Sequence, residues 1–262
     1  MWRTIYSALD NAPTGVIVEV ILVDDGSFHG QYGIDIEVAA NLFRSPPVKL
    51  IRMENQSGPT QSRMAAAEIA IGDALVFLES HCECLPGWLD QLLAEIGTNQ
   101  RVIAAPVVDT IHADKFDFVF TPIKKLQVGG FDWNLDIHQL SRSDRKKMKN
   151  KELVCPIRSP VLPHGIFAIS RNWFFEIGAF DQHIDNFFGE GDIELSVRTW
   201  LCGGYVTVCP CSHVGHVYRN VYTTSNISSN RPKNKAQIAD IWFEGVSRVH
   251  SRVSSIGNDS TS

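Results

Sequence analysis

The sequence contains no long hydrophobic run. A helix that crosses a membrane needs roughly 20 consecutive apolar residues, and the best candidate, Gly15–Val23, is short and contains Glu19. The opening segment Met1–Asp10 also lacks the apolar centre of a secretory signal peptide. We therefore expect no membrane span in this chain.

An excess of basic residues is also absent. The chain has 24 Lys and Arg residues against 29 Asp and Glu residues, which gives a formal net charge of −5. Nucleic-acid-binding proteins usually carry a broad basic surface, so we expect no nucleic-acid partner. The basic run Lys146–Leu153 is interpreted as a solvated loop, with the lip of an anion site as the alternative.

Cysteine is scarce, and the spacing typical of zinc ribbons, C-x-x-C, does not occur. The six cysteines are the C-x-C pairs Cys82/Cys84 and Cys209/Cys211, together with Cys155 and Cys202. Disulfides are the leading interpretation; buried thiols and a zinc site are the alternatives.

What the sequence does contain is an alternation of strand and helix patterns. Runs rich in β-branched residues predict strands at Ile17–Val23, Val48–Arg52, Ala74–Leu78, Val102–Val107, Ile166–Ser170 and Tyr205–Val208. Helical patterns occur at Met1–Leu9, Ile36–Phe43, Gln61–Ile71, Trp88–Ile96, Asn172–Ile177, Ile193–Leu201 and Ala236–His250. This order predicts one α/β domain with a mostly parallel, mixed sheet flanked by helices.

Two predicted strands end in residues that could bind a ligand. Ligands of open α/β sheets bind beyond the carboxyl ends of the strands. Asp24 and Asp25 end the first strand, where they could accept hydrogen bonds from a base or ribose or form an Asx turn. Glu79 and His81 follow a later strand and project to the same side, because they lie two residues apart.

A carboxylate and an imidazole together suit Mn²⁺ or Zn²⁺, but two ligands are too few. His213 and His216 are the candidates for a third ligand, and a structural role is the alternative for any one of them. A further acidic cluster contains Glu190 and Asp192, where glycines allow a close approach to a ligand and a simple helix cap is the alternative.

The order of these motifs resembles the polypeptide N-acetylgalactosaminyltransferases. The likeness extends from Met1 to Trp242. It rests on Leu22–Asp25, Phe77–His81, Gly87–Leu89, Gly129–Trp133, Pro160–Ser170, Gly178–Asp181, Glu194–Gly204 and Pro210–Arg219.

The resemblance implies a GT-A fold, a Mn²⁺ cofactor, UDP-GalNAc as donor, and transfer to Ser or Thr hydroxyls of protein acceptors with retention of configuration. It also implies a role for each matching residue. The metal ligands would be Glu79, His81 and His216; the nucleotide-sugar contacts Asp24, Asp25, Gln61, Ser80, Phe188, Arg219 and Tyr222; and the catalytic residues Glu190, Asp192 and Arg219.

Several positions depart from the family pattern. Glu79 stands in place of an aspartate, which adds a methylene group to the side chain, and the glutamate of Trp-Gly-Gly-Glu-Asn is shifted to Glu190. Gln61 replaces an arginine, and His164 replaces a glycine at the floor of the active site. These changes support an alternative hypothesis, a catalytically impaired homologue that binds a nucleotide or a partner.

The resemblance also implies a domain plan. We expect a catalytic domain over residues 1–242 that lacks the family's first strand, followed by a disordered tail over residues 243–262. The family's membrane anchor and lectin domain would lie outside the chain, as would the disulfide partners of Cys202 and Cys211. The expected location is the Golgi lumen.

Overall fold

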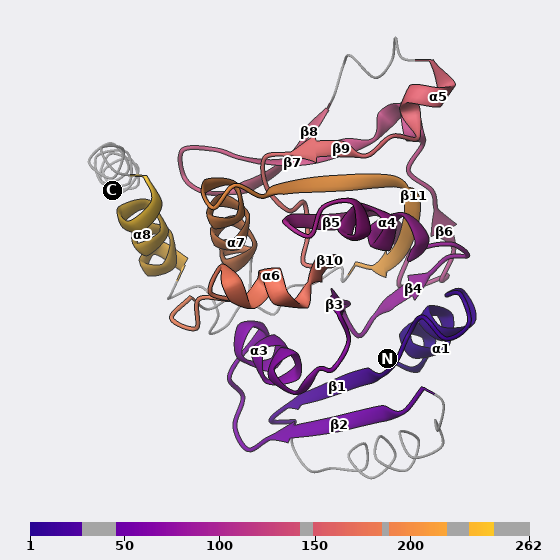
Figure 1. Ribbon diagram of the computed structural model, residues 1–262, viewed down its shortest axis with the longest axis horizontal. Coiled ribbons are helices and arrows are strands. Elements are labelled where there is room, and N and C mark those ends of the chain that lie inside the picture. Colours follow the sequence, from indigo (N-terminus) through magenta and orange to yellow (C-terminus); the bar gives the residue numbers. More distant parts are fainter. Residues whose placement is uncertain (28–45, 142–148, 185–188, 219–230, 244–262) are drawn as a thin grey trace.

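The computed structural model describes residues 1–27, 46–141, 149–184, 189–218 and 231–243. The strands are β1 (Val20–Asp25), β2 (Val48–Met53), β3 (Ala74–Phe77), β4 (Cys82–Cys84), β5 (Val102–Ile111), β6 (Phe118–Val119), β7 (Gln127–Phe131), β8 (Ile137–Ser141), β9 (Ile157–Ser159), β10 (Phe167–Ser170) and β11 (Tyr205–Val217). The helices are α1 (Trp2–Asp10), α3 (Pro59–Ile69), α4 (Asp90–Thr98), η1 (Ile123–Lys125), α5 (Asn150–Leu153), α6 (Arg171–Glu176), α7 (Glu190–Leu201) and α8 (Arg231–Trp242) (Figure 1).

A seven-stranded mixed sheet forms the centre of the fold. Its strand order is β3-β10-β5-β11-β4, with β6 added to β5 and β9 added to β11. β5 and β11 run parallel, and the other pairs in this sheet are antiparallel. Helices lie against this sheet (Figure 1), so the predicted α/β class with a mixed sheet is confirmed. The prediction that the sheet is mostly parallel is wrong: among the described strands of this sheet only β5 and β11 pair in parallel, because β4, β6, β9 and β10 join their neighbours in the antiparallel direction.

Alternating side chains of the central strands supply two cores. Ile103 and Ala105 of β5 join the cluster that contains Trp173 and Phe174 of α6. Val102 and Ala104 point the other way, toward a second cluster that includes residues of α1 and α4. Because successive strand residues face opposite sides, one short apolar run builds both layers of the core.

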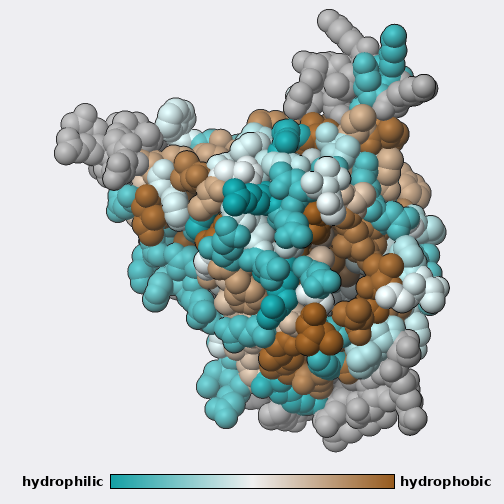
Figure 2. Space-filling view, viewed as in Figure 1, coloured by the Kyte–Doolittle hydropathy of each residue, from teal (hydrophilic) through white to brown (hydrophobic). Residues whose placement is uncertain are grey.

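β1 and β2 form a separate two-stranded parallel sheet beside β3 (Figure 1). In the described residues β1 pairs only with β2, and α3 packs against β1. Figure 2 shows a patch of hydrophobic residues on this face near the junction of the two sheets. Val18 and Ile71, which lie in the connections leading into β1 and β3, are 49% and 72% exposed.

β11 is longer than the sequence predicts. The predicted strand ended at Val208, and Pro210, which follows it, has no N–H to donate to a neighbouring strand. The pairing with β5 instead shifts register between Cys209 and His213 and continues to Val217. A β-bulge of this kind accommodates an unpaired residue without ending the strand, and the continuation carries both histidines.

The predicted disulfides are wrong for this structure. All six cysteines lie in the described residues, and no disulfide joins any of them. Cys82, Cys84 and Cys209 are buried among apolar side chains of the second core, and burial raises the pKa of Cys82 to about 12. The buried-thiol alternative is therefore correct for these three residues.

Two further expectations fall partly or wholly outside the described residues. The predicted helix Ile36–Phe43 lies outside them. The predicted helix Ala236–His250 corresponds to α8, which begins earlier, at Arg231, and is described as far as Trp242. In the described residues, no helix is both long enough and apolar enough to cross a membrane.

Candidate functional site

Three side chains meet at the end of the central sheet. Glu79 follows β3, His81 precedes β4, and His216 lies in β11. The Oε2 atom of Glu79 is 2.9 Å from Nε2 of His216 and 3.2 Å from Nε2 of His81. One potential ligand atom from each residue lies within 4.8 Å of the other two. At these distances a single metal ion could bind all three atoms.

The pairing of β4 with β11 brings these residues together. Cys82 is directly opposite His216 in the antiparallel register, and the backbone N–H of Val217 donates to the carbonyl of His81 at 3.1 Å. Backbone hydrogen bonds between β4 and β11 therefore hold His81 beside His216, although the two residues are far apart in the sequence.

The electrostatics of the cluster favour an ionised carboxylate. Burial by itself would raise the pKa of Glu79, but hydrogen bonds from His216 and His81 outweigh it and hold the pKa well below its usual range. All three side chains are at most one-third exposed. The cluster thus offers one anionic oxygen and two imidazole nitrogens.

Of the two candidate histidines, the structure places His216 in the cluster with Glu79 and His81. His213 and His216 are three positions apart, so they face opposite sides of β11. His213 pairs instead with Asp109 of β5, with Nδ1 and Oδ2 2.7 Å apart. The carboxylate of Asp109 is fully buried and also accepts a hydrogen bond from the N–H of Thr121 at 2.7 Å. His213 therefore has a structural partner away from the cluster.

The acidic start of α7 is buried. Glu190 and Asp192 are 1% and 4% exposed, and Nη1 of Arg63 is 3.7 Å from Oδ1 of Asp192. Nη2 of Arg63 donates to the carbonyl of Gly165 at 3.1 Å. The adjacent His164 lies within electrostatic reach of Glu79 and His216, and burial lowers its pKa to about 4. Arg63 therefore links α3 both to the buried start of α7 and to the backbone beside His164.

Asp24 and Asp25 lie at the end of β1, as predicted, and both hold loop backbone. Asp25 accepts hydrogen bonds from the N–H groups of Ser57 and Gly58, each at 2.8 Å. Asp24 accepts from the N–H of Ser27 at 3.1 Å, which is the Asx-turn alternative. The two hydrogen bonds to Asp25 position the start of α3, where Gly58 adopts a φ of 89°.

The other residues predicted to contact the nucleotide sugar do not form one cluster in the described residues. Gln61 of α3 donates to the carbonyl of Gln182 at 3.1 Å, and Ser80 is exposed between Glu79 and His81. Phe188, Arg219 and Tyr222 lie outside the described residues.

Sequence reasoning missed Arg63 and Asp109. Arg63 is one arginine in an Ala-rich helical stretch, and Asp109 follows a long apolar run. No local pattern marked either residue, because their partners Asp192 and His213 are more than a hundred residues away.

Comparison with known proteins identifies the class. Residues 1–178 match the family described as Glycosyl transferase family 2, so the chain belongs to that family. Within it, the chain is similar to polypeptide N-acetylgalactosaminyltransferases over most of its length. It is 39% identical to human polypeptide N-acetylgalactosaminyltransferase 15 over 92% of this chain and 37% of that protein. It is 34% identical to polypeptide N-acetylgalactosaminyltransferase 5 of Caenorhabditis elegans over 92% of this chain and 39% of that protein.

Solved structures agree on the fold. The crystal structure of GalNAc-T7 with UDP, GalNAc and Mn²⁺ superposes with a TM-score of 0.82 and 27% identity, over 93% of this chain and 46% of that chain. TarS of S. aureus gives a TM-score of 0.55 at 14% identity, over 90% of this chain and 35% of that chain, and shows the fold alone. The GT-A fold and the predicted family resemblance are confirmed, and the chain spans less than half the length of these relatives.

Proposed function

We propose that this chain transfers GalNAc from UDP-GalNAc to Ser or Thr hydroxyls of protein acceptors, with a metal ion and with retention of configuration. The observation that carries the proposal is the cluster of Glu79, His81 and His216 at the end of the GT-A sheet. Similarity to polypeptide N-acetylgalactosaminyltransferases, including a structure that holds UDP, GalNAc and Mn²⁺, supports it.

The donor set of the cluster suits Mn²⁺. A carboxylate oxygen with two imidazole nitrogens is the mixed ligation that first-row divalent ions accept, and the low pKa of Glu79 keeps its oxygen anionic. The two Nε2 atoms already converge on the Glu79 carboxylate. When bound, Mn²⁺ would supply Lewis-acid stabilisation of the diphosphate as it leaves.

Other residues would bind and orient the substrates. Asp192 and Arg63 lie together at the buried start of α7, where a carboxylate and a guanidinium can orient sugar hydroxyls. Glu190, two residues before Asp192 at the start of α7, is the candidate catalytic carboxylate. The predicted nucleotide contacts Asp24, Asp25, Gln61, Ser80, Phe188 and Tyr222, and the predicted phosphate contact Arg219, remain part of the proposal.

Asp24 and Asp25 have a double role in this proposal. The Asp24 carboxylate holds the turn at Ser27, and the Asp25 carboxylate holds the backbone of Ser57 and Gly58 before α3. A nucleotide would therefore meet ordered backbone beside both carboxylates. The division into a catalytic domain over residues 1–242 and a tail over residues 243–262 stays a prediction, as does the Golgi lumen as the site of action.

Sugar transfer to a peptide tests the function. The chain is incubated with UDP-GalNAc, Mn²⁺ and a Thr-rich peptide, and the peptide mass is followed with and without EDTA. We expect a gain of one GalNAc per modified Thr, lost with EDTA and in His216→Ala. No transfer together with intact UDP binding would replace this proposal with the impaired homologue.

A further inference from the structure

Helix α1 covers the free edge of β4 with side-chain hydrogen bonds. Thr4, Ser7 and Asn11 lie on one side of the helix at spacings of three and four residues. Ser7 Oγ accepts from the N–H of Cys84 at 2.9 Å, and Asn11 Nδ2 donates to the carbonyl of Cys84 at 2.8 Å. The polar stripe thereby satisfies backbone groups that an edge strand would otherwise leave unpaired.

Thr4 acts closest to the metal-type cluster. Its hydroxyl accepts a hydrogen bond from the N–H of Cys82 at 3.0 Å, and it can donate to the carbonyl of Cys82 at 2.8 Å or of Ser80 at 3.0 Å. These backbone groups flank His81 on both sides. The peptide between Glu79 and Cys82 is therefore fastened to α1 through one oxygen atom.

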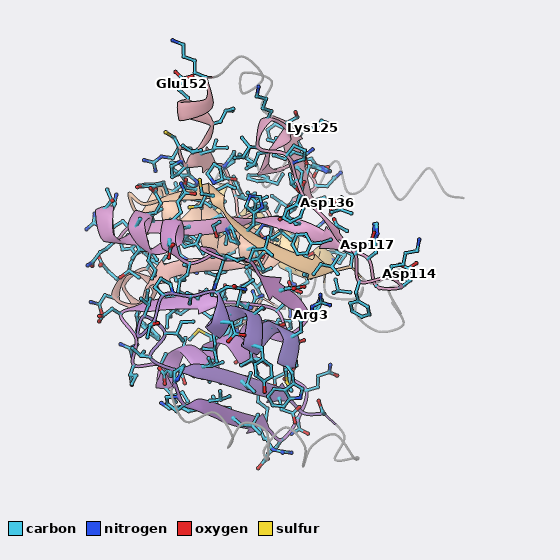
Figure 3. The ribbon with its side chains drawn as sticks, turned by 90° about the vertical axis from the view of Figure 1, so that its right-hand side faces the viewer. Arg3, Asp114, Asp117, Lys125, Asp136 and Glu152 are labelled. Carbon is cyan, nitrogen blue, oxygen red and sulfur yellow. The ribbon has the colours of Figure 1, made fainter. Side chains whose placement is uncertain are left out.

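This arrangement is buried and well anchored. Thr4 is 7% exposed, and the indole N–H of Trp88 donates to the carbonyl of Ala8 at 3.3 Å. Arg3 forms an ion pair with Glu83 of β4 at 2.6 Å. Figure 3 shows Arg3 on the same side of the molecule as Asp114 and Asp117. These contacts hold α1 against β4 and Trp88, so Thr4 is held beside the turn that carries His81.

We propose that Thr4 is a positioning residue for the metal site, and that its hydroxyl sets the geometry of Glu79 and His81 through the backbone of Ser80 and Cys82. The inference rests on the proposed function only in taking Glu79, His81 and His216 as metal ligands. Groups that hydrogen-bond directly to a metal ligand change metal affinity by about 10–100-fold when they are removed, and Thr4 acts one step further out, through the backbone beside the ligands.

The test compares three variants of the full chain by Mn²⁺ titration in a calorimeter. Thr4→Val removes the hydroxyl and keeps the shape of the side chain, and Thr4→Ser keeps the hydroxyl. Ser7→Ala is the matched control, because it removes one hydrogen bond between the same helix and the same strand, further from the ligands. We expect Thr4→Val to weaken Mn²⁺ binding by about tenfold or more, with wild-type affinity in Thr4→Ser and Ser7→Ala.

Hydrogen exchange of the peptide that spans residues 80–84 provides a readout that does not need metal. In Thr4→Val the Cys82 amide should exchange faster while the Cys84 amide stays protected, and Ser7→Ala should show the reverse. Equal Mn²⁺ affinity in wild type and Thr4→Val, or equal losses in Thr4→Val and Ser7→Ala, would overturn the positioning role. A wild-type chain that binds no Mn²⁺ would overturn the proposed metal site itself.

Discussion

Replacing Arg198 with Ala tests whether a buried ion pair holds α7 in place. Nε and Nη2 of Arg198 contact the two carboxylate oxygens of Glu194 at 2.8 and 2.7 Å. The same guanidinium donates to the carbonyls of Ile177 and Ala179, so it also ties α7 to the segment after α6. The side chains of the ion pair are only 8% and 4% exposed.

The expected loss is large because Glu194 would remain buried without its partner. Breaking a buried ion pair by removing one member costs about 3–5 kcal/mol, and the two carbonyls lose their donors as well. A domain of this kind has a total stability of about 5–15 kcal/mol. Arg198→Ala should therefore remove a substantial share of it, and it should loosen the helix start that carries Glu190 and Asp192.

Urea denaturation followed by circular dichroism measures this effect. The control is Asp117→Ala, because the His112–Asp117 pair has a comparable distance of 2.8 Å and about half of each side chain is exposed; its loss should cost only about 0–1 kcal/mol. The double variant Arg198→Met/Glu194→Leu should recover part of the loss, since it leaves no buried charge unpaired. A cost for Arg198→Ala no larger than that for Asp117→Ala would refute this reasoning.

Two other predictions concern His213 and Asp25. The hydrogen bond with Asp109 raises the pKa of His213 above its usual 6.5, so this pair stabilises the fold fully below that pH and loses its contribution as the pH rises through the raised value. Thermal unfolding should therefore show a larger destabilisation by His213→Gln at about pH 6 than at about pH 9, and a loss independent of pH would contradict the assignment. Asp25→Ala removes the acceptor of two backbone N–H groups and should cost about 1–3 kcal/mol in denaturant unfolding. Asp24→Ala, which loses one exposed bond, is its control and should cost less; equal costs would argue against the loop role of Asp25.

Local sequence patterns were sufficient to predict the α/β class and two members of the metal-type cluster, Glu79 and His81. Strand patterns depend on local periodicity, and Glu79 and His81 share a face because they are two residues apart. The third member of the cluster could not be chosen from residue types alone. His216 joins the cluster and His213 does not because β11 continues beyond Pro210 through a bulge, which no local pattern indicated.

Interactions between segments that are distant in the sequence could not be predicted from local patterns either. The contact of Arg63 with Asp192 and the bonds from Thr4 to the turn at His81 depend on how α3 and α1 pack. The interpretation of the cysteines was wrong because C-x-C spacing does not show whether a thiol is buried, and three of the six lie inside the core.

The most direct test of the central claim is Mn²⁺-dependent UDP binding, measured by calorimetry on wild type, His216→Ala and His213→Gln. The two variants change histidines of the same strand that face opposite sides, so they separate the metal site from general damage to β11. We predict UDP binding that requires Mn²⁺, is lost in His216→Ala and is kept in His213→Gln. Binding that is unchanged in His216→Ala, or absent from wild type, would contradict the assignment of Glu79, His81 and His216 as the metal centre.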